Sequence, residues 1–133
     1  MSKIDALVQA ATAARANAHA PYSRFAVGAA LRSEDGGIHA GANVENAAYP
    51  EGLCAEAAAI AAMVTAGGRR IAEMVVLADG PPLCSPCGGC RQRIREFATP
   101  ETVIHLCTPS GVQQSVTLGE LLPLAFGPDN LPG

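Results

Sequence analysis

The sequence lacks any cluster of lysine or arginine, and its 9 basic and 12 acidic residues give a formal net charge of −3. Proteins that hold a phosphate backbone usually carry a basic stripe, so we expect no nucleic acid as a partner. No run approaches the roughly 20 apolar residues of a membrane span. Asp5 stands where a signal peptide would need apolar residues. We therefore expect neither a membrane partner nor secretion.

Disulfide bonds are a further feature that the sequence argues against. Its five cysteines are an odd number in a chain without a secretion signal, which indicates reduced thiols and a cytoplasmic location. Hydrophobic residues make up 49% and charged residues 16%, a globular composition without a disordered tract. The length of 133 residues predicts one domain over residues 1–133 with a single core.

The order of the predicted elements indicates an α/β fold. Helices alternate with buried strands after an initial β-hairpin, which predicts a three-layer α/β/α sandwich with a mixed central sheet of about five strands. Helical periodicity and capping signals predict helices at 2–19, 54–66 and 90–97, and a short helix that opens at the capping box Thr117-x-x-Glu120. Apolar runs and alternation predict strands at 25–31, 38–44, 74–78, 103–107 and 112–116.

Three cysteines occur in two stretches that each introduce a predicted helix. Cys87 and Cys90 are spaced C-x-x-C, and the Gly-Gly between them lets the backbone fold tightly under a metal ion. This spacing alone also fits a redox dithiol, but Cys54 adds a third thiol from earlier in the chain. Three thiolates leave one coordination position of a zinc ion open for water, which is typical of a catalytic site.

Glu56 follows Cys54 by two residues and is the candidate catalytic side chain. A carboxylate that lies near the metal without binding it can move the protons of the bound water. An acidic residue in the first turn of a helix is also common for dipole reasons alone. The catalytic hypothesis for Glu56 therefore depends on the three cysteines around it.

Cys54-Ala55-Glu56 and Pro86-Cys87-Gly88-Gly89-Cys90 together resemble the cytidine deaminase family in its small, three-cysteine zinc form. The resemblance covers almost the whole chain. Other matching segments are PYSRFAVGAA at 21–30, NVENAAYP at 43–50, CRQ at 90–92, LLP at 121–123 and FGP at 126–128. It implies one zinc ion per chain bound by Cys54, Cys87 and Cys90, with Glu56 as the catalytic acid and base.

The resemblance also implies a substrate and the residues that bind it. Asn43 and Glu45 would hold the ribose hydroxyls, and Phe25 would pack on the pyrimidine. Two further aromatic residues would complete the pocket of a neighbouring subunit in a homotetramer, although ordinary packing is the alternative for all three aromatics. The implied substrate-binding residues are Phe25, Asn43, Glu45, Tyr49, Ala55 and Phe126.

The reaction implied by the resemblance is zinc-dependent hydrolytic deamination of cytidine and 2′-deoxycytidine to uridine and 2′-deoxyuridine, with release of ammonia, as in pyrimidine salvage. Water would attack C4 of the cytosine, and no organic cofactor is implied. One alternative is a modified or antibiotic pyrimidine nucleoside as substrate. Another is a non-catalytic zinc module in which Cys84 supplies a fourth ligand, and a thiol–disulfide role ranks lowest because it needs no distant third cysteine.

Ala57 departs from the family pattern, because many members have an arginine there that offsets the anionic metal centre. We hypothesise that Arg91 and the two helix ends replace it here. Cys84 is expected to be a buried apolar thiol at the end of a strand, and Cys107 a core residue. The expected roles of the three histidines, His19, His39 and His105, are structural.

Overall fold

The fold is built on a five-stranded mixed sheet with helices on both faces, which confirms the predicted α/β class. The computed structural model describes residues 2–132. The strands lie in the order β2-β1-β3-β4-β5, with β3 parallel to β4 and all other neighbouring pairs antiparallel. The strands are β1 Gly28–Ser33, β2 Ile38–Ala42, β3 Ile71–Leu77, β4 Val103–Thr108 and β5 Gly111–Thr117.

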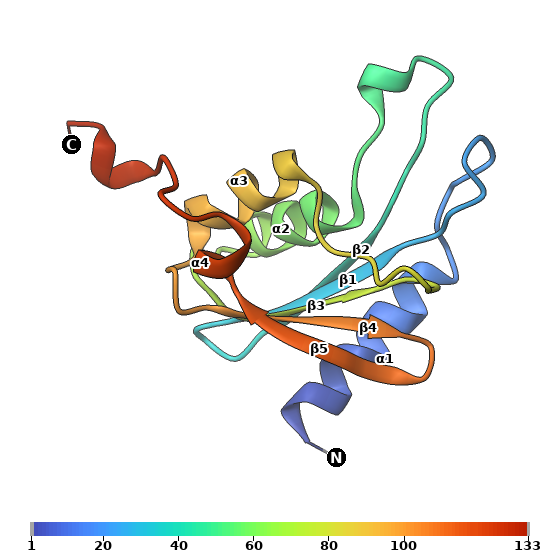
Figure 1. Cartoon of the computed structure of the whole chain (residues 1–133), viewed down its shortest axis with the longest axis horizontal. Helices are drawn as coiled ribbons and strands as arrows, with labels where there is room; N and C mark the ends of the chain where they lie inside the picture. The colour runs from blue at the N-terminus through green and yellow to red at the C-terminus, as the bar shows by residue number, and fades with distance from the viewer. Residues whose placement is uncertain (1, 133) are drawn as a thin grey trace.

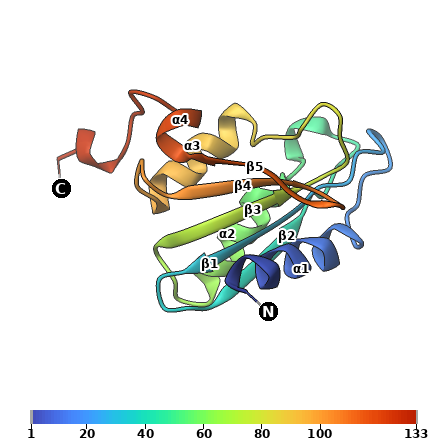
Figure 2. The ribbon, with the colours of Figure 1, turned by 60° about the horizontal axis from the view of Figure 1, so that its bottom comes forward.

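The helices form two layers, one on each side of the sheet (Figures 1 and 2). Helix α1 packs on one face, and α2 and α3 pack on the other. Among residues 2–132, no helix is both long enough and apolar enough to cross a membrane. The helices are α1 Lys3–Arg15, α2 Ala55–Thr65, α3 Gly88–Phe97 and α4 Leu118–Leu121, with 3-10 turns η1 Tyr49–Glu51 and η2 Pro128–Asn130.

The central strand β3 is covered on both faces, as its apolar run predicts. Met74 and Val76 belong to the cluster beneath α2 and α3, whereas Val75 and Leu77 belong to the cluster beneath α1. This alternation is the period of two that a strand imposes on its side chains. The sheet therefore separates two apolar cores, and β3 contributes to both.

The N-terminal helix is shorter than predicted. Its start is confirmed, because Ser2 and Asp5 form a capping box, but the helix ends at Arg15 instead of continuing to residue 19. The backbone N–H of His19 donates to the carbonyl of Asn43, and the N–H of Glu45 donates to the carbonyl of His19. His19 therefore pairs with the chain beyond β2, which is incompatible with a helical conformation.

The first strand also begins later than predicted, at Gly28. The side chain of Asn43 takes the place of a neighbouring strand: its Oδ1 accepts from the N–H of Val27 at 2.9 Å, and its Nδ2 donates to the carbonyl of Phe25 at 2.8 Å. This side-chain pairing satisfies the backbone without a ladder of strand hydrogen bonds. The segment around Phe25 is consequently a loop that Asn43 holds in place.

Candidate metal centre and substrate pocket

The first turns of two helices bring three cysteines together. Cys54 is the N-cap of α2 and Cys87 is the N-cap of α3, while Cys90 lies in the first turn of α3. Their sulfur atoms all lie within 4.8 Å of one another, and the sulfurs of Cys54 and Cys87 are 3.9 Å apart. Two sulfurs bound to one tetrahedral zinc ion at about 2.3 Å would be separated by about 3.8 Å. The donor set therefore fits zinc in both chemistry and spacing.

The protein environment alone does not favour thiolates at all three positions. Burial, followed by the nearby charges of the other groups, raises the pKa of the Cys90 thiol, and burial likewise raises the pKa of Cys54. Burial also opposes ionisation of Cys87, but hydrogen bonds from the Cys90 backbone and from the other two thiols lower its pKa overall. A divalent cation bound between the three cysteines supplies the positive charge that favours loss of their thiol protons.

Glu56 lies beside these thiols in the first turn of α2 and is only 5% exposed. Burial raises the pKa of its carboxyl group, while its own backbone N–H and the positive charge of Arg93 partly oppose that rise. A carboxyl group with a raised pKa exchanges a proton more readily near neutral pH, as a general acid or base must. Ala55 and Ala57, on either side of it, are also buried.

The arginines of α3 contact different groups. Arg91 donates to the carbonyl oxygens of Pro86 and Leu121 at 2.8 Å and 2.7 Å, so it holds the cysteine loop to the end of α4. It also donates to the hydroxyl of Ser85 at 3.1 Å. By contrast, Nη1 of Arg93 lies 3.5 Å from the sulfur of Cys90. Direct contact with a cysteine sulfur thus comes from Arg93, whereas the hypothesis from the sequence assigned the offsetting charge to Arg91 and the two helix ends.

The remaining cysteines and the histidines lie outside the metal group within residues 2–132. The sulfur of Cys84 is 3.8 Å from the carbonyl of Ser85. Cys107 is fully buried, and burial raises its pKa to about 11, so its predicted place in the core is confirmed. His105 is buried between Glu73 and Ser115, at 2.6 Å and 2.7 Å. These contacts fit the structural role expected for His105.

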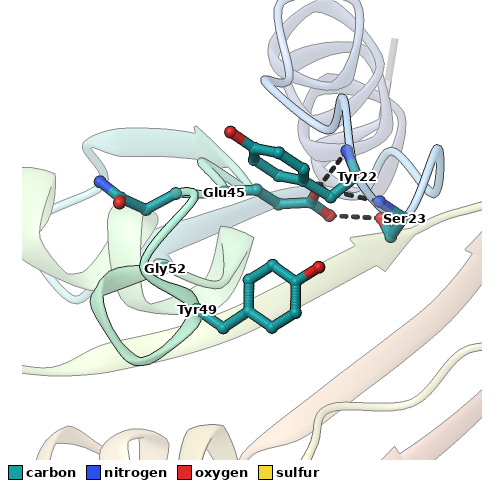
Figure 3. A pocket seen from close by; sticks show the side chains of 6 residues that line it. Tyr22, Ser23, Glu45, Tyr49 and Gly52 are labelled. Atoms are coloured by element: carbon teal, nitrogen blue, oxygen red, sulfur yellow. Dashed lines mark hydrogen bonds between the residues drawn. The ribbon is translucent and has the colours of Figure 1, made fainter.

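A cavity of about 360 Å³ lies between the loop at Tyr22 and Ser23 and the segment that leads from β2 to Cys54, and none of the three grouped cysteines lines it. Figure 3 shows Tyr22 and Ser23 on one of its sides and Tyr49, from η1, on another. The rings of Tyr22 and Tyr49 are tilted to each other with their centres 6.0 Å apart. Two of the predicted substrate-binding residues, Glu45 and Tyr49, line this cavity. The full lining is Tyr22, Ser23, Glu45, Asn46, Tyr49 and Gly52.

Glu45 is held by the loop that precedes Phe25. Its Oε1 accepts the backbone N–H groups of Tyr22 and Ser23, each at 3.0 Å, and its Oε2 accepts the hydroxyl of Ser23 (Figure 3). These hydrogen bonds, that of the Ser23 hydroxyl first, hold the pKa of Glu45 below its usual value. The carboxylate is therefore ionised at neutral pH and fixed at the edge of the cavity.

The other four predicted substrate-binding residues do not line this cavity; they are Phe25, Asn43, Ala55 and Phe126. Phe25 is 42% exposed and is tied to Asn43 through its carbonyl. Tyr49 is 75% exposed. Phe126 lies in the tail beyond α4 and is 57% exposed; its carbonyl accepts a hydrogen bond from Gln92 of α3 at 2.8 Å. Phe126 is not among the residues that line the cavity.

Sequence reasoning did not assign roles to several residues that the structure places at the site. Tyr22 and Ser23 belong to a matching segment, but a side chain that supports Glu45 carries no sequence signal of its own. Asn46 and Gly52 belong to the segment between β2 and Cys54. For Arg93, the spacing of three residues from Cys90 was an available signal, because such residues lie on one face of a helix.

A buried carboxylate beside three thiols at two helix N-termini defines a zinc-binding enzyme of the α/β class. The sequence matches the cytidine and deoxycytidylate deaminase zinc-binding region over residues 1–106. The chain belongs to this family, whose members are hydrolases that act on carbon–nitrogen bonds. That match confirms the resemblance found in the sequence.

Several cytidine deaminases are similar to this chain over most of its length. The cytidine deaminase of Sporosarcina psychrophila is 41% identical over 128 residues, which cover 96% of this chain and 94% of the relative. The cytidine deaminase of Mycobacterium tuberculosis H37Rv is 44% identical over 123 residues, covering 92% and 88%. A crystal structure of cytidine deaminase from Burkholderia pseudomallei superposes with a TM-score of 0.88 at 41% identity, covering 95% of this chain and all of that one.

Proposed function

We propose that the protein hydrolyses cytidine and 2′-deoxycytidine to uridine and 2′-deoxyuridine and releases ammonia. The observation that carries this proposal is the grouping of Cys54, Cys87 and Cys90 within 4.8 Å, with the buried Glu56 in the helical turn that follows Cys54. A purely structural zinc site has no use for such a carboxylate. The names of the relatives support cytidine as the substrate.

Cys54, Cys87 and Cys90 would hold the zinc ion, one in each chain. When bound, zinc acts as a Lewis acid that makes water reactive at neutral pH. Glu56 then takes a proton from the attacking water and delivers it to N3 of the base as the oxygen adds to C4. It next passes the second proton of that water to the exocyclic amine, so that the C4–N4 bond breaks and ammonia leaves. The raised pKa of Glu56 suits this shuttle.

Asn43 and Glu45 would bind the ribose. A carboxylate offers about four acceptor positions, and three positions of Glu45 are used by Tyr22 and Ser23. One position therefore remains for a ribose hydroxyl. Asn43 uses Oδ1 for Val27 and one amide hydrogen for Phe25, which leaves its second amide hydrogen for the sugar. Both side chains are already fixed, so little ordering would be needed on binding.

Phe25 would pack on the pyrimidine ring, and the backbone of Ala55 would contact the base. Tyr49 and Phe126 would complete the pocket of a neighbouring subunit in a homotetramer. Their exposure of 75% and 57% supports this assignment, because large aromatic side chains gain most when an interface covers them. We further propose a single catalytic domain over residues 1–133, acting in cytoplasmic pyrimidine salvage.

Absorbance spectroscopy tests the proposed function directly. Purified protein is incubated with cytidine and with 2′-deoxycytidine, and the loss of the cytosine band is followed while zinc is measured on the same sample. Turnover with about one zinc per chain is the expected result. Bound zinc without turnover of either nucleoside would contradict it, and modified pyrimidine nucleosides would be assayed next.

A further inference from the structure

Arg93 brings a positive charge into contact with the candidate zinc site. Helix α3 carries three arginines at alternate positions, and each reaches a different part of the molecule. Arg91 donates to backbone carbonyls of the cysteine loop and α4, and Arg95 lies 3.8 Å from Asp129 of the tail. Nη1 of Arg93 instead lies 3.5 Å from the sulfur of Cys90.

The helix geometry explains why Arg93 reaches that sulfur. Residues three apart lie on one face of a helix, and long side chains lean toward the N-terminus. The position four residues before Arg93 is Gly89, where an added Cβ would stand only 3.2 Å from Nη1 of Arg93. The absence of a side chain at Gly89 therefore leaves room for the guanidinium to fold back over the first turn of α3.

The site around the Arg93–Cys90 contact would carry a net negative charge when zinc is bound. A zinc ion with three thiolates carries a formal charge of −1, and an ionised Glu56 adds a second negative charge close by. Ala57, next to Glu56, is small and only 8% exposed, so it contributes no charge. A charge-assisted hydrogen bond to a thiolate is roughly twice as strong as a neutral one. Arg93 is thus placed to donate to the Cys90 sulfur and to offset this negative charge.

We propose that Arg93 is a positioning residue of the zinc site, whose guanidinium donates a hydrogen bond to the Cys90 sulfur and offsets the negative charge that the three sulfurs and zinc would carry together. The inference rests on the proposed function in that Cys90 must bind zinc. The side chain of Arg93 is solvent-exposed, so salt screens its charge and limits its effect. Sensitivity to salt is therefore a signature of the mechanism that a purely structural arginine would not show.

The test compares zinc retention in four purified holoenzymes: wild type, Arg93→Gln, Arg93→Lys and Arg95→Gln. Transfer of zinc to an excess of a chromophoric chelator is timed at low and at high salt. Arg95→Gln is the matched control because it removes the same charge from the same helix without touching a cysteine. At low salt we expect Arg93→Gln to lose zinc about five- to twentyfold faster than wild type, the effect of a charged hydrogen bond of about 1–2 kcal/mol.

Arg93→Lys should lose zinc at an intermediate rate, because lysine keeps the charge but not the planar donor. High salt should bring wild type toward Arg93→Gln. If Arg93→Gln does not fold, the salt dependence of wild type and the intermediate rate of Arg93→Lys still support or refute the inference.

Equal rates in wild type and Arg93→Gln would overturn the inference, as would an equal acceleration in Arg95→Gln. Wild-type protein that binds no zinc would instead refute the proposed function itself.

Discussion

Gly41 of β2 lies so close to Ala58 of α2 that a Cβ added to the glycine would stand 2.5 Å from the Cβ of Ala58. Real Cβ atoms do not approach this closely, so any other residue would push α2 away from the sheet. The first turn of α2 carries Cys54 and Glu56. The distance between a strand and a helix, set by one missing side chain, therefore positions the metal site.

Replacing Gly41 by alanine should destabilise the fold. Overpacking of a tight contact costs about 1–3 kcal/mol, and the backbone of Ala59, also 2.5 Å from the added Cβ, offers no room to relax. Urea denaturation measures the effect. Gly80→Ala is the control, because an added Cβ there meets only ordinary contacts at 3.5 Å or more. Equal stability of Gly41→Ala and wild type would show that α2 can shift freely.

Replacing Glu56 by glutamine should abolish most of the activity and leave the metal in place. General acid–base catalysis contributes roughly 10²- to 10⁴-fold to a rate, so kcat for cytidine should fall by that factor. Zinc content should stay at the wild-type value, because Glu56 is not among the grouped ligands. Glu101→Gln, which changes an exposed acid, is the control. Retained activity in Glu56→Gln would remove it from the mechanism.

Cys87→Ser and Cys84→Ser should differ sharply in zinc content. Cys87 belongs to the group of three sulfurs and Cys84 does not. We expect Cys87→Ser to purify with little zinc and Cys84→Ser to keep the full amount, measured by atomic absorption on protein from the same preparation. Loss of zinc from Cys84→Ser would instead favour a closed, four-cysteine structural site.

Replacing Glu45 by glutamine should weaken substrate binding more than it slows the chemistry. The neutral amide accepts the Ser23 and Tyr22 hydrogen bonds less strongly and offers one acceptor oxygen fewer. KM for cytidine should rise about tenfold, the effect of roughly 1.4 kcal/mol, with a smaller change in kcat. Steady-state kinetics with Glu51→Gln, an exposed acid in η1, provide the comparison. An unchanged KM would argue against a ribose contact.

Glu73 should contribute to stability in a way that depends on pH. Burial opposes its ionisation, but hydrogen bonds from Arg32 at 2.8 Å and His105 at 2.6 Å outweigh burial and lower its pKa. A lowered carboxyl pKa stabilises the fold above the ordinary value near 4.3, and the contribution is lost as pH falls through the folded value.

Glu73→Gln should therefore lower the free energy of unfolding by about 1–3 kcal/mol at pH 7. The difference in the free energy of unfolding between Glu73→Gln and wild type should become smaller as the pH falls below about 4. Chemical denaturation at pH 7 and at a pH below about 4 measures this difference. Glu34→Gln, which changes an exposed acid in a turn, is the control. A gap that is independent of pH would mean that packing alone is responsible.

The elements whose signals are local could be predicted from the sequence. The alanine-rich helix after Cys54 ends at Thr65, close to the predicted residue 66, because Gly67 adopts a positive φ of 101° that favours glycine. The capping box of Thr117 and Glu120 forms as its pattern indicates. The grouping of the three cysteines was implied by the family resemblance and not by a local signal, because Cys54 and Cys87 are 33 residues apart in the chain.

Features that depend on tertiary contacts could not be predicted in this way. Helical spacing continues past Arg15, but the backbone of His19 pairs with Asn43 and Glu45 instead. Apolar alternation begins at Phe25, but the side chain of Asn43 takes the hydrogen bonds that a strand would make. The direction of each arginine on α3 likewise depends on which groups the folded chain places around it.

The sulfurs of Cys54 and Cys87 lie on either side of β3 in the chain, 33 residues apart. An ion that binds both would close a loop containing all of α2 and the central strand. A covalent crosslink of that span would restrict the unfolded chain by about 3–4 kcal/mol, and a metal crosslink acts on the same ensemble. Removing the ion should therefore speed amide hydrogen exchange within β3. The zinc ion would then stabilise the central strand of the sheet in addition to its role in catalysis.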